Sequence, residues 1–76
     1  KVYDNQAKYF RSLKIHESQE EIETTPEFSI FEYHIKPTFE FEQELLSHGE
    51  SVEVLEPTDL RERMKSTLQA ALEHYK

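Results

Sequence analysis

The 76-residue sequence contains no cysteine, no tryptophan and only one glycine, Gly49. Without cysteine the chain can form neither a disulfide scaffold nor a thiolate zinc site. A single glycine cannot build a glycine-rich phosphate-binding loop, which excludes the common nucleotide-binding motifs. No apolar run approaches the roughly 20 residues that span a bilayer, and no signal-peptide pattern opens the chain. We therefore expect a cytoplasmic location and no membrane segment.

Basic residues are scarce: nine Lys and Arg stand against sixteen Asp and Glu, giving a net charge of −7. The acidic excess is greatest in residues 28–56, which carry one basic and seven acidic side chains, whereas residues 57–76 carry four basic and three acidic ones. An acidic surface repels phosphate backbones, and domains that bind duplex DNA usually present a basic face. Direct DNA binding by this chain is therefore disfavoured.

The length suits one domain with a thin core, because chains this short bury only about 60% of their unfolded surface. The chain begins at Lys1 directly in what looks like the end of a strand, so we expect residues 1–76 to be a fragment of a longer protein. Asp4 or Asn5 can cap a helix that runs to about Leu13. Residues 28–36 alternate as a strand, with Phe31 and Tyr33 on one face, and the turn at 24–27 predicts a hairpin with the preceding run.

The second half of the sequence predicts a helix, a strand and a long closing helix. Thr38 is a suitable N-cap for the helix after Pro37, and Gly49 suits a left-handed position at its end. Residues 51–55 alternate as a short strand, after which Glu56 can cap and Pro57 can open the next helix. Its apolar stripe comprises Leu60, Met64, Leu68, Ala71, Leu72 and Tyr75. We expect this stripe to pack on the domain's own sheet rather than on a partner.

The order β-α-β-β-α-β-α predicts an α+β fold, namely a ferredoxin-like β-α-β-β-α-β sandwich with an additional C-terminal helix. Only about three residues of the first strand are present, although this strand lies centrally in that topology. The strand can be completed by the same chain or by a neighbouring one, and weak support there would ease exchange between two chains.

Catalytic and metal chemistry find little support in the residue pattern. The four histidines form no H-x-x-x-H pair, so we expect no metal site. The paired glutamates resemble a solvated acidic face, because a chain this short leaves little room for a cleft that would raise one carboxyl pKa. His16 and Ser18 lack a third orienting acid and an oxyanion turn. We therefore expect neither an enzyme nor a cofactor.

The phrase "ELLSHGESVEVLEPTDLRERM", followed by a leucine and by Tyr75, closely resembles the C-terminal extension (WCX) of bacterial WYL-domain transcriptional regulators. Upstream, "YFRSLKIHESQEE" is similar to the family's segment in which a helix leads into a proline-x-His-x-Ser-Gln phrase. His16, Ser18 and Gln19 match that phrase, whereas Lys14 stands where the family often has proline. The resemblance covers nearly the whole chain.

The resemblance implies a C-terminal dimerisation and effector-response domain, and a homodimeric parent that binds DNA through an N-terminal helix-turn-helix and senses ligands through a WYL domain. Neither of those domains is present in this sequence. On this reading the hairpin and neighbouring helices form an interface that includes Phe31, Tyr33 and Arg61. One alternative is a module that itself binds a small molecule or single-stranded nucleic acid, with polar contacts from His16, Ser18, Gln19 and His34. Another is a self-standing ferredoxin-like domain that is accessory to an enzyme.

Overall fold

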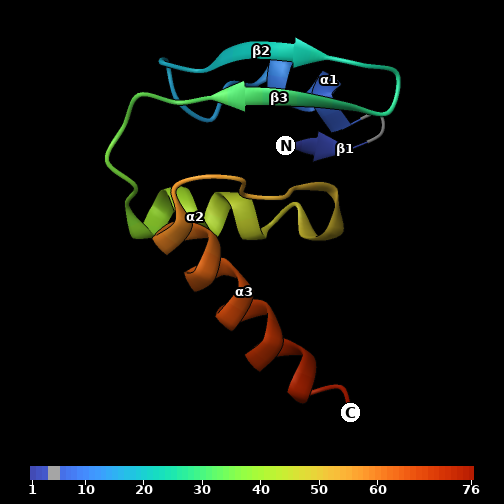
Figure 1. Cartoon of the computed structure of the whole chain (residues 1–76), viewed down its shortest axis with the longest axis vertical. Coiled ribbons are helices and arrows are strands. Elements are labelled where there is room, and N and C mark those ends of the chain that lie inside the picture. Colours follow the sequence, from blue (N-terminus) through green and yellow to red (C-terminus); the bar gives the residue numbers. More distant parts are fainter. Residues whose placement is uncertain (4–5) are drawn as a thin grey trace.

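The computed structural model describes residues 1–3 and 6–76 of the chain (Figure 1). The elements follow the order β1 (Val2–Tyr3), α1 (Ala7–Ser12), β2 (Glu20–Thr24), β3 (Phe28–Glu32), α2 (Phe39–Leu46), the 3-10 helix η2 (Gly49–Ser51) and α3 (Thr58–Glu73). The α+β class is therefore confirmed. The helix start predicted at Asp4 or Asn5 lies outside the described residues. No helix within the described ranges is long and apolar enough to cross a membrane.

The three strands form an antiparallel sheet in the order β1-β3-β2. The predicted hairpin is confirmed as β2–β3, with a register irregularity between Glu21 and Glu23. The second strand of the hairpin ends at Glu32 rather than at residue 36, because β2 offers no backbone partner beyond Glu20. The backbone N–H of His34 instead donates to the Ser18 hydroxyl at 3.0 Å.

The strand expected over residues 51–55 is reduced to a single bridge. Val52 pairs with Val2 in an antiparallel bridge next to β1, and the backbone nitrogen of Glu53 donates to the Lys1 carbonyl at 2.8 Å. Beyond this bridge, the carbonyl of Val54 accepts from the Arg61 guanidinium at 2.8 Å. A complete four-stranded ferredoxin-like sheet is consequently not confirmed.

The predicted start of α2 is confirmed, because the Thr38 hydroxyl accepts from the backbone N–H of Phe41 at 3.1 Å. Gly49 has the expected positive φ of 56°, although it opens η2 two residues beyond the helix cap at Ser47. The predicted start of α3 is one residue too early: Pro57 is the N-cap rather than the first helical residue, and no side chain caps this helix.

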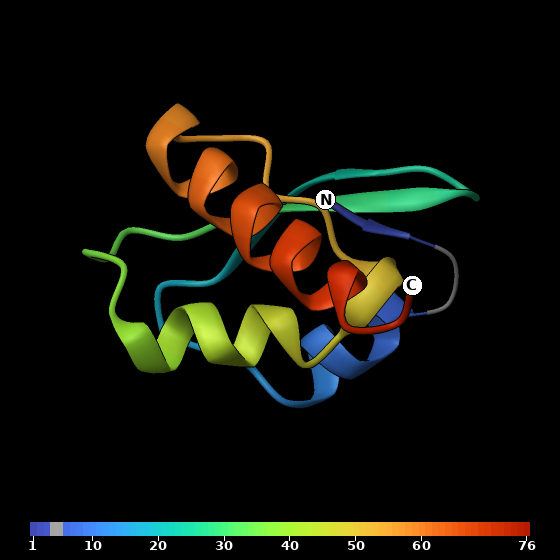
Figure 2. The ribbon, with the colours of Figure 1, turned by 90° about the horizontal axis from the view of Figure 1, so that it is seen from below.

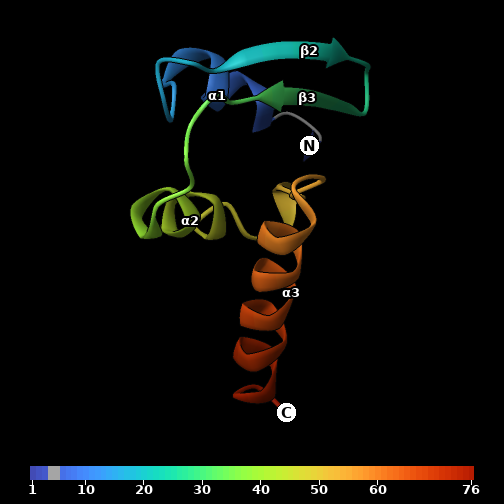
Figure 3. The ribbon, with the colours of Figure 1, turned by 60° about the vertical axis from the view of Figure 1, so that its left-hand side comes forward.

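The α3 stripe, which we expected to pack on the domain's own sheet, is covered only at its start, where it packs on Leu45 of α2. Leu60 and Met64 are buried, at 4% and 8% exposure, whereas Leu68 and Leu72 are 49% and 54% exposed. Tyr75 is almost fully exposed, at 88%. The helix leads away from the sheet in Figures 1 and 3, and Figure 2, viewed from its far end, shows it in front of the remaining elements. Only the first two turns of α3 are therefore anchored.

Apart from Ser29, the buried side chains of the described residues are apolar and fall into two small groups. Val2, Ala7 and Phe10 lie between α1 and the sheet, and the Phe10 ring stacks on Phe31 with centroids 5.5 Å apart. The second group consists of Leu45 from α2 with Leu60 and Met64 from α3. Residues of both groups, among them Phe10 and Leu45, line a hollow between them.

Candidate functional site

His16, Ser18 and Gln19 lie in the loop between α1 and β2, and the structure brings them together with the end of β3. The Nδ1 atom of His16 lies 2.7 Å from the Ser18 hydroxyl and accepts from the Ser18 backbone N–H at 3.1 Å. The same hydroxyl accepts from the backbone of His34, whose own ring is exposed. The His-x-Ser-Gln phrase therefore ties the loop to the hairpin. The ligand-binding role expected for these four residues remains a prediction.

Gln19 links three segments of the chain. Its side-chain nitrogen donates to the Phe10 carbonyl at the end of α1 (2.7 Å), and its oxygen accepts from the Tyr33 hydroxyl (2.6 Å). The same oxygen accepts from the Ile15 backbone at 3.3 Å. Burial raises the pKa of Tyr33 to about 12, because the phenolate would lose hydration. Tyr33 is thus a neutral hydrogen-bond donor that fixes the loop against β3.

The three residues expected at an interface occupy different surroundings. Phe31 and Tyr33 are half-buried within the domain, where Tyr33 meets Phe41 of α2 edge to face with centroids 5.2 Å apart. Arg61 is exposed and pairs with Glu53 at 2.7 Å. Hydrogen bonds from Tyr3 and Arg61 lower the pKa of Glu53. Of the three, only Arg61 lies on an open surface.

A groove on α3, which we call the α3 groove, borders the exposed part of its apolar stripe. Its apolar walls are formed by Val52, Val54, Met64, Leu68 and Leu72, and its volume is about 330 Å³. Arg61, Lys65, Glu53 and Gln69 add polar atoms along it. The groove is an apolar channel with a polar border, as is common for protein–protein contact surfaces.

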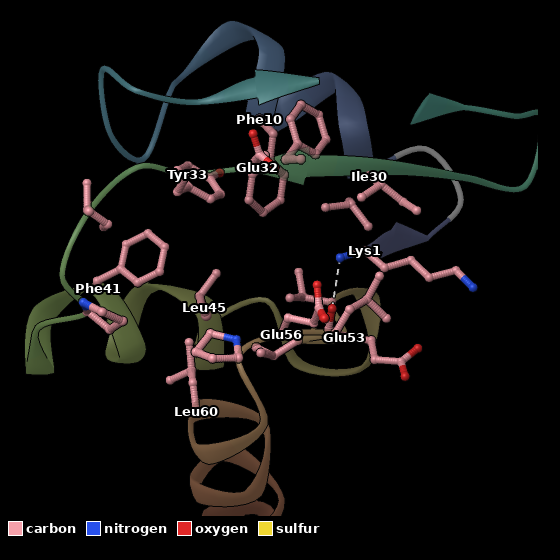
Figure 4. A pocket seen from close by; sticks show the side chains of 18 of the residues that line it. Lys1, Phe10, Ile30, Glu32, Tyr33, Phe41, Leu45, Glu53, Glu56 and Leu60 are labelled. Atoms are coloured by element: carbon pink, nitrogen blue, oxygen red, sulfur yellow. Dashed lines mark hydrogen bonds between the residues drawn. The ribbon is translucent and has the colours of Figure 1, made fainter. Parts of the chain in front are cut away.

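A larger hollow lies between β3 and the start of α3 (Figure 4). Its volume is about 540 Å³, which is within the range of small-molecule sites. Its aromatic walls come from Phe10, Phe31, Tyr33 and Phe41, and aliphatic side chains from β2, β3, α2 and residues 52–60 complete it. Because Ile22 in this lining is 54% exposed, the apolar surface of the hollow is open to solvent.

The charged side chains of the hollow are mostly acidic. Glu32, Glu53 and Glu56 line it, against one basic residue, Lys1. Figure 4 shows Glu32 on the β3 side and Glu56 on the opposite side, with the Lys1 side chain directed outward. The side-chain ammonium of Lys1 lies over the Phe28 ring, 4.3 Å from its centroid, and its α-ammonium donates to the Glu53 carbonyl at 2.8 Å. This electrostatic character favours a cation and disfavours phosphate or nucleic acid.

Glu20, Glu32 and His34 form an exposed cluster at the end of the hairpin. Their potential ligand atoms lie within 4.8 Å of one another. Glu20 and Glu32 face each other across the strands, an unfavourable pairing that His34, 3.2 Å from Glu32, offsets when it is protonated. The cluster is fully accounted for as a solvated charge group.

Residues 1–72 match the WCX domain family model, and the chain therefore belongs to the WCX domain family. Searches of the curated proteins and of the solved structures found no matching protein. WCX domains are known as C-terminal domains of WYL-containing regulators.

The hollow is the feature that sequence reasoning missed. Its lining comes from six segments of the chain, and no local sequence pattern predicts the distances between a sheet and the helices packed near it. One signal was available, namely the −6 charge of residues 28–56, which contribute all three carboxylates of the hollow.

Proposed function

We propose that this chain is the C-terminal dimerisation and effector-response domain of a WYL-type transcriptional regulator, whose parent binds DNA through a separate N-terminal domain. Membership of the WCX family supports this context. The chain acts through binding contacts rather than catalysis: the histidine and serine that could suggest a nucleophilic pair are engaged in fixing a loop.

The observation that carries the dimerisation proposal is the unpartnered stripe of α3. Beyond the buried Met64, the apolar residues Leu68, Ala71 and Tyr75 recur at steps of three and four, which is the spacing of a helix–helix seam. Leu68 and Leu72 are about half exposed although they border the α3 groove. A second copy offers the same stripe, and two such surfaces can cover each other about a twofold axis.

The electrostatics also permit this pairing. Residues 57–76 carry four basic and three acidic side chains, whereas the remainder of the chain carries a net charge of −8. Contact through α3 therefore brings together the least repulsive parts of two acidic chains. Arg61, which borders the α3 groove, lies at the edge of this contact.

Sedimentation equilibrium of the chain tests the proposal with two matched variants. Leu68→Glu places a charge in the seam, whereas Ala70→Glu makes the same charge change on the opposite side of α3. We expect the unmodified chain and Ala70→Glu to show the same monomer–dimer equilibrium, and Leu68→Glu to raise the dissociation constant at least tenfold. Dimerisation through α3 would be contradicted if the unmodified chain stayed monomeric at millimolar concentration. It would also be contradicted if Leu68→Glu and Ala70→Glu changed the dissociation constant equally.

A further inference from the structure

We propose that the hollow between β3 and the start of α3 binds an organic cation, namely an ammonium group attached to an aromatic or branched apolar body. This inference rests on the effector-response part of the proposed function and is independent of dimerisation. It assigns a site within the WCX domain itself.

Size and surface chemistry indicate a small molecule with an apolar body. The volume of about 540 Å³ is sufficient for a ligand of several tens of atoms. Aromatic and aliphatic side chains make up most of the lining, and burial of a ligand against them would remove apolar surface from water on both sides. Because these walls are open to solvent, a ligand can reach their apolar surface without any change in the packing of the domain.

The charged groups indicate the sign of the ligand. Glu53 is already paired with Arg61 and Glu32 lies 3.2 Å from the neighbouring His34, so Glu56 is the carboxylate most able to answer a ligand charge, with Glu32 as the second. They come from opposite sides of the hollow (Figure 4), so a bound ammonium would lie between two negative groups. A ligand carboxylate or phosphate would meet the same groups with repulsion.

The aromatic pair adds a second source of cation selectivity. Tyr33 and Phe41 both line the hollow, and their rings are inclined at 73° to each other. The negative face of an aromatic ring attracts an ammonium within about 6 Å. Carboxylates and ring faces therefore favour the same ligand charge.

Three probes of similar size separate charge from apolar contact: phenethylammonium, neutral 2-phenylethanol and anionic 3-phenylpropanoate. Each is titrated into the ¹⁵N-labelled chain at low salt while the amide signals of Ile30, Tyr33 and Val54 are followed. We expect the cation to shift these signals with at least threefold higher affinity than the alcohol, and the anion to bind weakest. Added salt should reduce the preference for the cation, because exposed charges are screened.

Matched charge variants locate the selectivity. Glu32→Gln with Glu56→Gln should weaken phenethylammonium binding about fivefold and leave 2-phenylethanol unchanged, as expected for two partly exposed ion pairs. Glu27→Gln with Glu40→Gln makes the same charge change at exposed positions outside the hollow and should leave both affinities unchanged. Equal binding of the three probes, no shift at the hollow amides, or equal effects of the two double variants would overturn the proposal.

The same titration on Leu68→Glu separates this inference from dimerisation. Cation binding that is equal in the dimeric and monomeric forms supports an independent site. Binding seen only in the monomeric variant would mean that a second copy fills the hollow, and would overturn the ligand assignment while leaving the dimer intact. A monomeric chain that binds the cation would overturn dimerisation alone.

Discussion

Phe10 is the side chain whose loss should damage this fold most. It is 2% exposed, it stacks on Phe31 at 5.5 Å, and its ring also meets His48 with centroids 4.7 Å apart. Phe10 thus joins α1 to the sheet and to the turn after α2. Replacing a buried phenylalanine with alanine costs about 3–5 kcal/mol, from lost burial and from the cavity left behind.

That cost is comparable with the entire stability expected of such a domain. A single core in a chain of this size rarely supplies more than about 3–5 kcal/mol. We therefore expect Phe10→Ala to show no cooperative urea transition by circular dichroism. Phe10→Leu keeps most of the apolar volume and should remain folded, with a free energy of unfolding lower by about 1 kcal/mol.

The neighbouring Tyr9 provides the control, because it lies on the same helix and is 64% exposed. Tyr9→Ala should change the free energy of unfolding by less than about 0.5 kcal/mol. The reasoning is refuted if Phe10→Ala and Tyr9→Ala have equal urea midpoints, since Phe10 would then not connect α1 with the sheet.

Two further substitutions test individual interactions. The pKa of Glu21 is lowered to about 2, first by its hydrogen bond from Arg11 and then by that from Thr24. The stabilisation from this ionised carboxylate is fully present above the unfolded pKa near 4.5 and is lost as the pH falls toward 2. Glu21→Gln should therefore lower the free energy of unfolding by about 1 kcal/mol at pH 7. In urea titrations below pH 4 the difference should become progressively smaller. A pH-independent difference would exclude this origin. Gly49→Ala should lower the free energy of unfolding by about 1 kcal/mol, because the φ of 56° is unfavourable for alanine. Steric contact adds nothing to this cost, since no heavy atom lies within 4 Å of the added Cβ. An unchanged thermal midpoint would show that the turn adopts another conformation without cost.

Local sequence signals predicted the elements that depend on near neighbours. The cap at Thr38, the positive φ of Gly49 and the hairpin around residues 24–27 each follow from a few adjacent residues, and all three are present. The prediction was wrong where a distant group decides the outcome. At residues 51–55 the alternation of Val52 and Val54 favours a strand, yet the structure forms only the Val2–Val52 bridge, and the Val54 carbonyl accepts from Arg61.

The α3 stripe shows a second kind of limit. Periodicity identifies which side of a helix is apolar, but it does not say what covers that side. Leu60 and Leu68 belong to the same pattern, and only the first is covered, because α2 reaches no further along the helix than the Leu45–Met64 cluster. The sequence correctly predicted that His16, Ser18 and Gln19 lie together. It did not show that their hydrogen bonds would be made within the chain itself.

The outer strand β2 has a consequence for how the domain behaves when crowded. It forms one edge of the sheet, and it carries Glu20, Glu21 and Glu23 together with a register irregularity. Negative charge and broken register on an edge both discourage another strand from adding to it, which protects the chain against fibril growth. A chain that carries both Glu20→Gln and Glu23→Gln should lose part of this protection and form amyloid-like aggregates more readily.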